Sequence, residues 1–278
     1  LLFALLATPA TLLLEIAVVT ILPMPRPLDW LPTAHGVLAI FCLALLVVLR
    51  ADLRDGVTGC VRGIAAGLRE ARTGARLTLL IGLLSGSAAA LHGFWNAPSA
   101  WDELAYQLPQ ALQPYQDGFV GPVQANTQWA DTYPRGATLL YYWTLRLIRS
   151  DTAIHCVNAA FGAVLFLATY VAARRMSFDR DWSSLCAALV YSAPVVLYMS
   201  AVGYIDLVVG GSCACVIAAA LPERSGRWTW ASAALLLLAA IMTWWMKFTP
   251  IVTIALTIGF VLVRGCVQIV RGGHSRQV

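Results

Sequence analysis

Four charged side chains lie where polar sequence borders long apolar runs: Asp102, Arg135, Asp206 and Lys247. A carboxylate can take a proton from a reacting hydroxyl, and arginine or lysine can hold an anionic group such as phosphate. Ionisable residues close to membrane spans are often functional, because burying their charge is costly. If the apolar runs bring all four residues to one side of a membrane, they predict an outward-facing pocket of mixed charge.

Each of these residues also has a purely structural explanation. Ser99-x-x-Asp102 is a capping-box pattern, and acids favour the first turn of a helix. Asp206 could cap a helix in the same way. Lys247 could extend from the end of a span to the membrane surface. The local sequence leaves both kinds of explanation open.

The composition is typical of a membrane protein. Of the 278 residues, 59% are hydrophobic and 12% are charged, and the mean hydropathy is +0.73. Soluble domains carry about 25% charged residues. Period-2 strand patterns are missing from the sequence, and an open sheet is not stable in lipid. We therefore predict an all-α, multi-pass integral membrane bundle.

Long apolar runs predict about eight transmembrane helices, since a helix needs about 20 apolar residues to cross the hydrocarbon core. The predicted spans are 1–22, 34–49, 77–95, 152–173, 183–201, 203–221, 229–246 and 249–263. A further apolar stretch, Ala137–Ile148, is too short to cross. We expect it to form an interfacial helix that leads into the fourth span.

The placement of arginine orients the predicted bundle. The net charge of +5 arises almost wholly from arginine, because Lys247 is the only lysine. With eight alternating spans, the arginine clusters share one side, which the positive-inside rule assigns to the cytoplasm. They comprise Arg50, Arg54, Arg62, Arg69, Arg72, Arg76, Arg174, Arg175, Arg180, Arg224, Arg227, Arg264, Arg271 and Arg276.

This orientation divides the chain into three parts. Residues 1–76 are expected to form two spans and a cytoplasmic linker, residues 77–264 a transmembrane core, and residues 265–278 a cytoplasmic tail. The core then carries a long extracytoplasmic loop at 96–150, and connections of this length are usually functional or disordered. Its many aromatic residues suit a membrane–water interface.

The beginning of this loop predicts an amphipathic helix. Trp101, Leu104, Leu108 and Leu112 recur at spacings of three and four residues. That spacing favours a helix lying flat on the membrane with these residues on one face. It also places Asp102 with Tyr106, and Glu103 with Gln107, on common sides.

Other classes of site find little support in the sequence. The chain has no Walker loop, GxSxG or HExxH motif, and no basic run interleaved with aromatics that would predict a nucleic-acid partner. His35, His92 and His155 occur singly, without metal-ligand spacing. Glu15 lies inside the first predicted span, where it could pair within the bundle or border a cavity.

An ordered series of motifs resembles the C-type superfamily of membrane glycosyltransferases, in particular relatives of protein O-mannosyltransferases and of the lipid A aminoarabinose transferase. In those proteins a span precedes a long outer loop that opens with an acidic motif and closes with an aromatic-proline motif. The similar segments here are Trp101-Asp102-Glu103-Leu104-Ala105-Tyr106, Tyr133-Pro134-Arg135, Ser192-Ala193-Pro194 with Asp206, and Lys247-Phe248-Thr249-Pro250.

The resemblance implies transfer of a sugar from a polyprenyl-phosphate donor to an acceptor on the extracytoplasmic face of a bacterial-type plasma membrane. It implies Asp102, Glu103 and Asp206 as catalytic residues, with Asp102 as the base. Tyr106, Arg135 and Lys247 would bind the substrate, and a divalent cation is a candidate cofactor. Besides the donor lipid, membrane lipids would be partners.

The chain departs from the family pattern in places. Gln107 replaces a common histidine, and Thr132-Tyr133 stands where the aminoarabinose branch has an acidic–basic pair. Family members are also much longer, so the chain resembles their N-terminal portion.

Two other functions remain open at this level. A transporter or lipid-translocating protein would carry charges deep within its spans, and Glu15 is the clear case. A non-catalytic accessory subunit would use its outer polar residues as local caps that never meet. The discriminating question is whether Asp102, Asp206 and Arg135 face one cavity.

Overall fold

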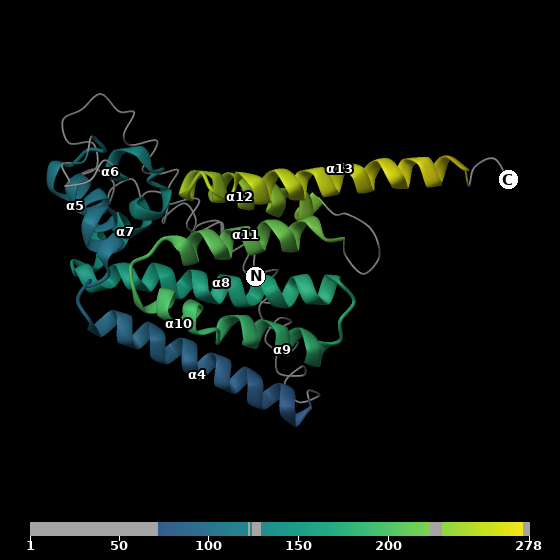
Figure 1. Ribbon diagram of the computed structural model, residues 1–278, viewed down its shortest axis with the longest axis horizontal. Helices are drawn as coiled ribbons and strands as arrows, with labels where there is room; N and C mark the ends of the chain where they lie inside the picture. Colours follow the sequence, from purple (N-terminus) through teal and green to yellow (C-terminus); the bar gives the residue numbers. More distant parts are fainter. Residues whose placement is uncertain (1–71, 122, 124–128, 223–229, 275–278) are drawn as a thin grey trace, which may run out of the picture.

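A computed structural model describes residues 72–121, 123, 129–222 and 230–274, and within them every regular element is a helix. The elements, shown in Figure 1, are α4 (Thr73–Trp95), the π-helix η2 (Glu103–Gln107), α5 (Leu108–Asp117), α6 (Trp129–Thr132), α7 (Gly136–Ile148), the 3-10 helix η3 (Asp151–Ile154), α8 (His155–Arg175), α9 (Arg180–Tyr191), α10 (Pro194–Ala201), α11 (Asp206–Ala220), α12 (Trp230–Met246) and α13 (Ile251–His274). The predicted all-α class is confirmed for these residues. The predicted spans 1–22 and 34–49, with Glu15 and the cytoplasmic linker up to Ala71, lie outside them.

Two of the described helices are long and apolar enough to cross a membrane: α4, and the continuous segment Asp151–Arg175 formed by η3 and α8. The bent pair of α9 and α10 would make a third span. Shorter apolar helices occupy Asp206–Ala220, Ser232–Met246 and Ile251–Arg264. Helices thus occur at every predicted span within the described part of the chain, while the number of membrane crossings stays a prediction.

The predicted continuous span at 183–201 is wrong in one respect, because it bends by 58° between α9 and α10. Pro194 stands in the first turn of α10, and Ala193 before it has φ −58° and ψ 132°. A proline ring disfavours helical backbone in the preceding residue and removes one backbone donor. The helix therefore ends at Tyr191 and restarts in a new direction.

Arginine contacts mark one end of the bundle, here called the Arg-rich end. The Arg72 Nε lies 3.6 Å from the Asp181 carboxylate, which brings together the starts of α4 and α9. Arg175, at the end of α8, donates 2.9 Å to the carbonyl of Leu221 and 3.0 Å to the hydroxyl of Ser232. The end of α11 and the beginning of α12 therefore lie at this end too, as expected for helices that alternate in direction.

The opposite end, here called the loop end, is covered by α5, α6 and α7 (Figure 1). There the end of α4 meets the start of α8, because His155 Nδ1 lies 2.5 Å from the Gly93 carbonyl oxygen. The start of α11 meets the turn after α12 through Asp206 and Lys247. Residues that the sequence predicted to share the outer side thus lie at one end of the fold.

Helix α7 differs from its predicted interfacial setting. Tyr141, Tyr142 and Trp143 are at most 1% exposed and belong to the main hydrophobic core, where α7 packs against α5. Gly136 permits a close approach to α12, because a Cβ there would overlap the backbone carbonyl of Trp245. The aromatic side chains of α7 are therefore core residues of the protein and not a membrane-facing belt.

The outer faces of several helices carry exposed apolar side chains. Large apolar side chains exposed in such number suit contact with lipid or another apolar surface. On α4, α12 and α13 they include Leu77, Leu80, Ile81, Leu84, Leu237, Ile241, Trp244, Val252, Leu256, Leu262 and Val263. These side chains, together with the span-length helices, make the described part of the chain compatible with a membrane.

Candidate functional site at the loop end

A π-helical segment divides the amphipathic face that the sequence predicts for the first loop helix. Trp101 and Leu104 are 67% and 50% exposed, whereas Leu108 is buried and Leu112 packs against the core. The backbone of Glu103–Gln107 is π-helical, which widens the turn and rotates the residues that follow it. The four residues therefore do not share one exposed face, and the position of this segment on a membrane stays a prediction.

The two adjacent acids lie in different environments. Asp102 is half-buried, whereas Glu103 is 0% exposed. Glu103 Oε1 lies 2.6 Å from Nε2 of His155, a side chain that is only 2% exposed. Burial opposes ionisation of Glu103, but hydrogen bonding and charge interaction with His155 outweigh it and lower the pKa of the carboxyl group. The two residues form an ion pair enclosed by protein.

Hydrogen bonding defines the charge of this pair. Glu103 Oε2 accepts bonds from the backbone N–H groups of Ser99 at 3.1 Å and Ala100 at 3.2 Å. His155 has the Gly93 carbonyl at one ring nitrogen and the Glu103 carboxylate at the other. When Glu103 is ionised, both of these partners are acceptors, and a ring that donates from both nitrogens is an imidazolium. All four polar atoms of the pair are therefore satisfied.

These contacts revise the predicted capping box. The acid that reaches back to the start of the helix is Glu103, which accepts from the backbone N–H of Ala100, and not Asp102. The structural explanation that the sequence offered for Asp102 therefore belongs to its neighbour. His155 has no metal-ligand spacing in the sequence. The one indication that it could belong to the site was its place near the outer end of the predicted span 152–173.

Asp102 belongs to a connected series of side chains. Its carboxylate accepts a 2.9 Å hydrogen bond from the Tyr106 hydroxyl, as their spacing of four residues predicted. The rings of Tyr106 and Tyr133 lie 5.7 Å apart. Lys247 Nζ lies over the Tyr133 ring, 6.0 Å from its centre. The series therefore extends from the loop to the turn after α12.

Asp206 completes this series from α11. Lys247 Nζ donates 2.8 Å to the Asp206 carboxylate, and their side chains are 19% and 46% exposed respectively. Asp206 stands in the first turn of α11, where the helix dipole favours an acid. Asp102, Tyr106, Tyr133, Lys247 and Asp206 are here called the loop-end series.

A second network holds the turn that precedes Asp206. Asn158, which is 0% exposed on α8, donates from Nδ2 to the carbonyls of Met199 at 3.0 Å and Tyr204 at 2.7 Å, and also to that of Val202. Its Oδ1 accepts from the Tyr141 hydroxyl at 2.7 Å. Backbone carbonyls at the end of α10 thus obtain the partners that helix ends lack. No spacing or motif in the sequence predicted this network.

Arg135 donates to the backbone carbonyl of Gly121. Both residues belong to the loop at 96–150, so this contact is internal to the loop. Tyr106 is 7% exposed, and its hydroxyl donates a hydrogen bond to the Asp102 carboxylate. The substrate-binding roles of Arg135, Tyr106 and Lys247 stay predictions.

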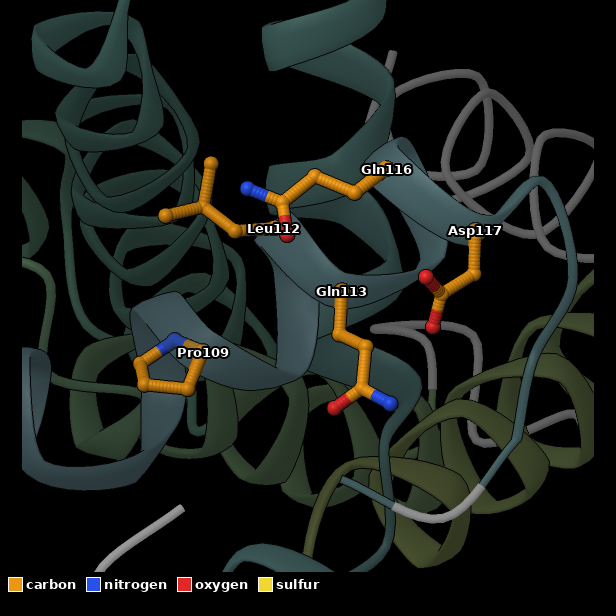
Figure 2. A pocket seen from close by; sticks show the side chains of 5 residues that line it. All are labelled: Pro109, Leu112, Gln113, Gln116 and Asp117. Atoms are coloured by element: carbon orange, nitrogen blue, oxygen red, sulfur yellow. The ribbon is translucent and has the colours of Figure 1, made fainter. Parts of the chain in front are cut away.

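A hollow of about 350 Å³ lies along one face of α5 (Figure 2). It is lined by Pro109, Leu112, Gln113, Gln116 and Asp117. These positions recur at three- and four-residue spacing, so they belong to one helical face. None of the sequence-predicted site residues lines this hollow.

The described residues do not assemble a metal site. Within those ranges, no three or more histidine, cysteine, aspartate or glutamate side chains are placed to hold one ion. Asp102 and Asp206 have tyrosine and lysine as their neighbours. The divalent cation that the resemblance suggests stays a prediction.

Comparison with known proteins does not identify a family. No protein-family model, no curated protein and no solved structure matches this chain. The geometry of the loop end is accordingly the basis for the functional argument.

Proposed function

We propose that the protein is a membrane glycosyltransferase that moves a sugar from a polyprenyl-phosphate-linked donor to an acceptor at the loop end. The loop-end series is the observation that supports this function most directly. It places a half-buried carboxylate and a cation in one connected group at the end of apolar helices. A lipid-linked phosphate donor needs such charges at headgroup depth, with an apolar surface beside them for its chain.

In the proposed reaction, Asp102 acts as general base. Its carboxylate takes the proton of the acceptor hydroxyl while the acceptor oxygen bonds to the anomeric carbon of the donor sugar. The bond from that carbon to the phosphate oxygen breaks, and its electron pair leaves with the polyprenyl phosphate. Tyr106 orients the Asp102 carboxylate through its hydroxyl.

Lys247 is proposed to stabilise the departing phosphate. Its ammonium group lies at the end of α12 and is partly exposed, so a lipid phosphate could approach it. Asp206 holds Lys247 in place through the 2.8 Å contact. We assign Arg135 a second contact to the phosphate, because a guanidinium can bind two phosphate oxygens at once. Asp206 is thus a partner of Lys247 in this proposal.

The proposed orientation follows the arginine distribution. The Arg-rich end would face the cytoplasm of a bacterial-type plasma membrane, and the loop end its outer side. The accessory-subunit alternative predicts that outer polar residues stay with local partners. Asp206 and Lys247 are 41 positions apart yet form an ion pair, which favours a shared site over isolated caps.

The test uses membranes that contain the full chain and radiolabelled polyprenyl-phosphate sugars as donors. Donor consumption by the wild type is compared with that of Asp102→Asn at equal expression. A lost general base lowers turnover on the order of 10²- to 10⁴-fold. Asp117→Asn is the matched control, because this acid belongs to the same loop but lies outside the loop-end series.

The alternative outcomes are distinct. Equal turnover by wild type and Asp102→Asn would place the active site elsewhere. If the wild type consumed none of the donors, while transporting or binding a polyprenyl-phosphate lipid, the lipid-translocating function would replace this proposal.

A further inference from the structure

The buried pair of Glu103 and His155 joins segments that are far apart in the chain. The His155 ring contacts the Gly93 carbonyl at the end of α4 and the Glu103 carboxylate in η2. Glu103 in turn holds the backbone of Ser99 and Ala100. The end of α4, the start of the loop helix and the start of α8 are therefore fixed to one another by two side chains.

The pair also sets the position of the turn before α11. Gly203 lies so close to Glu103 that a Cβ at this position would overlap the carboxylate, with 2.8 Å to its Cδ and 3.0 Å to its Cγ. On its other side, the Gly203 carbonyl oxygen lies 3.1 Å from the Tyr141 hydroxyl and shares with Asn158 the one proton of that hydroxyl. The Tyr204 phenol lies against the backbone of Asp102. The turn is therefore confined between Glu103 and α7.

The neighbours of these residues belong to the loop-end series. Asp102 directly precedes Glu103, and Asp206 follows Gly203 by three positions. A buried ion pair contributes little net stability compared with apolar residues of similar size, because both charges lose their hydration. The pair instead fixes the positions of the segments around it, because both polar atoms of Glu103 and both ring nitrogens of His155 have defined partners.

We propose that Glu103 and His155 form a latch that fixes Asp102 and Asp206 relative to each other, with Glu103 as a positioning residue and not a catalytic one. The latch does not depend on the proposed transferase reaction. It would position these acids equally well for a different ligand at the loop end.

The test is hydrogen exchange measured by mass spectrometry on the full chain in lipid nanodiscs. Glu103→Gln keeps the size of the side chain but removes its charge, and His155→Gln removes the imidazolium. In each variant we expect exchange to rise about tenfold in peptides covering 99–107 and 202–206. The exchange of peptides from the middle of α11 should stay unchanged. The double variant should show the same exchange as either single variant, because each of the three variants removes the same ion pair.

A pH series on the wild type separates positioning by the charged pair from simple packing. Exchange at 99–107, corrected for the intrinsic pH effect, should rise as acid protonates Glu103, and it should be flat in Glu103→Gln. The other titratable groups that act on the pair are Asp151, Tyr141 and Tyr204. Of these, Asp151 is the carboxylate that acts on His155, so Asp151→Asn is the control and should keep the wild-type profile.

Specific results would overturn the latch. Unchanged exchange at both 99–107 and 202–206 in Glu103→Gln would show that the pair does not hold them. Increased exchange throughout α8 and α11 would indicate a general loss of stability instead of a local one. Should neither variant fold, a wild-type profile that is flat in acid would refute the proposal, and a rising one would support it. None of these measurements uses a sugar donor, so they are independent of the proposed activity.

Discussion

Gly203→Ala tests how tightly the loop end is packed around Glu103. Gly203 has an ordinary backbone conformation, since Gly118 is the glycine with positive φ in the described part of the chain. An alanine here therefore acts through its methyl group alone. That methyl group would overlap the Glu103 carboxylate.

The size of the effect follows from what holds Glu103. A free glutamate could rotate away, but this one is tied by His155 at 2.6 Å and by two backbone N–H groups. Overpacking a fixed neighbour costs about 1–3 kcal/mol of unfolding free energy. We expect Gly203→Ala to lower the free energy of unfolding by an amount within this range.

The assay is equilibrium unfolding of the purified protein in mixed detergent micelles with increasing SDS, followed by tryptophan fluorescence. Gly210→Ala is the matched control, because a Cβ at Gly210 meets no atom within 4 Å. Alanine within a helix is favoured over glycine by roughly 0.5–1 kcal/mol, so this control should be stabilised. If both variants were at least as stable as the wild type, the tight contact between Gly203 and Glu103 would be refuted.

Three further predictions follow from the described contacts. Arg175→Met should lower the free energy of unfolding by about 1–3 kcal/mol, because it removes the donors that satisfy carbonyls at the end of α11. The control is Arg174→Met, whose contact is more exposed and whose loss should cost less in the same SDS titration. The pKa of Glu103 is lowered in the folded protein, so its contribution to stability is present above the ordinary value of 4.5 and is lost as the pH falls below it; Glu103→Gln should flatten the dependence of the unfolding midpoint on pH between 7 and 3. Tyr106→Phe should reduce donor turnover on the order of tenfold, less than Asp102→Asn, because it leaves the base but removes the hydroxyl that orients it, and equal losses would contradict a purely orienting role.

Part of this arrangement could be predicted because it depends on local sequence. Helices in lipid satisfy their own backbone, so each long apolar run predicts a helix wherever it occurs. The contact between Asp102 and Tyr106 also follows from four-residue spacing along one helix. The sharing of one end by Asp206 and Lys247 required only that successive helices reverse direction.

The bend before Pro194 could have been anticipated in the same way, because a proline restricts its own backbone and that of the preceding residue. The π-helical turn at Glu103–Gln107 was not predicted, although Pro109 lacks the N–H group that would bond the Ala105 carbonyl in an α-helix. This turn separates Trp101 and Leu104, which are exposed, from Leu108 and Leu112, which pack against protein.

The helical class, the positions of the described helices and the residues that gather at the loop end all follow from the order of apolar and polar residues along the chain. Which of those residues touch depends on how the helices pack. Glu103 and His155 are 52 positions apart, and their pairing depends on how α4, the loop helix and α8 are rotated about their axes. Van der Waals packing brings apolar helices together in lipid without fixing one direction, whereas a buried charge must find its partner within hydrogen-bond distance. That geometry emerges only when all the elements are packed.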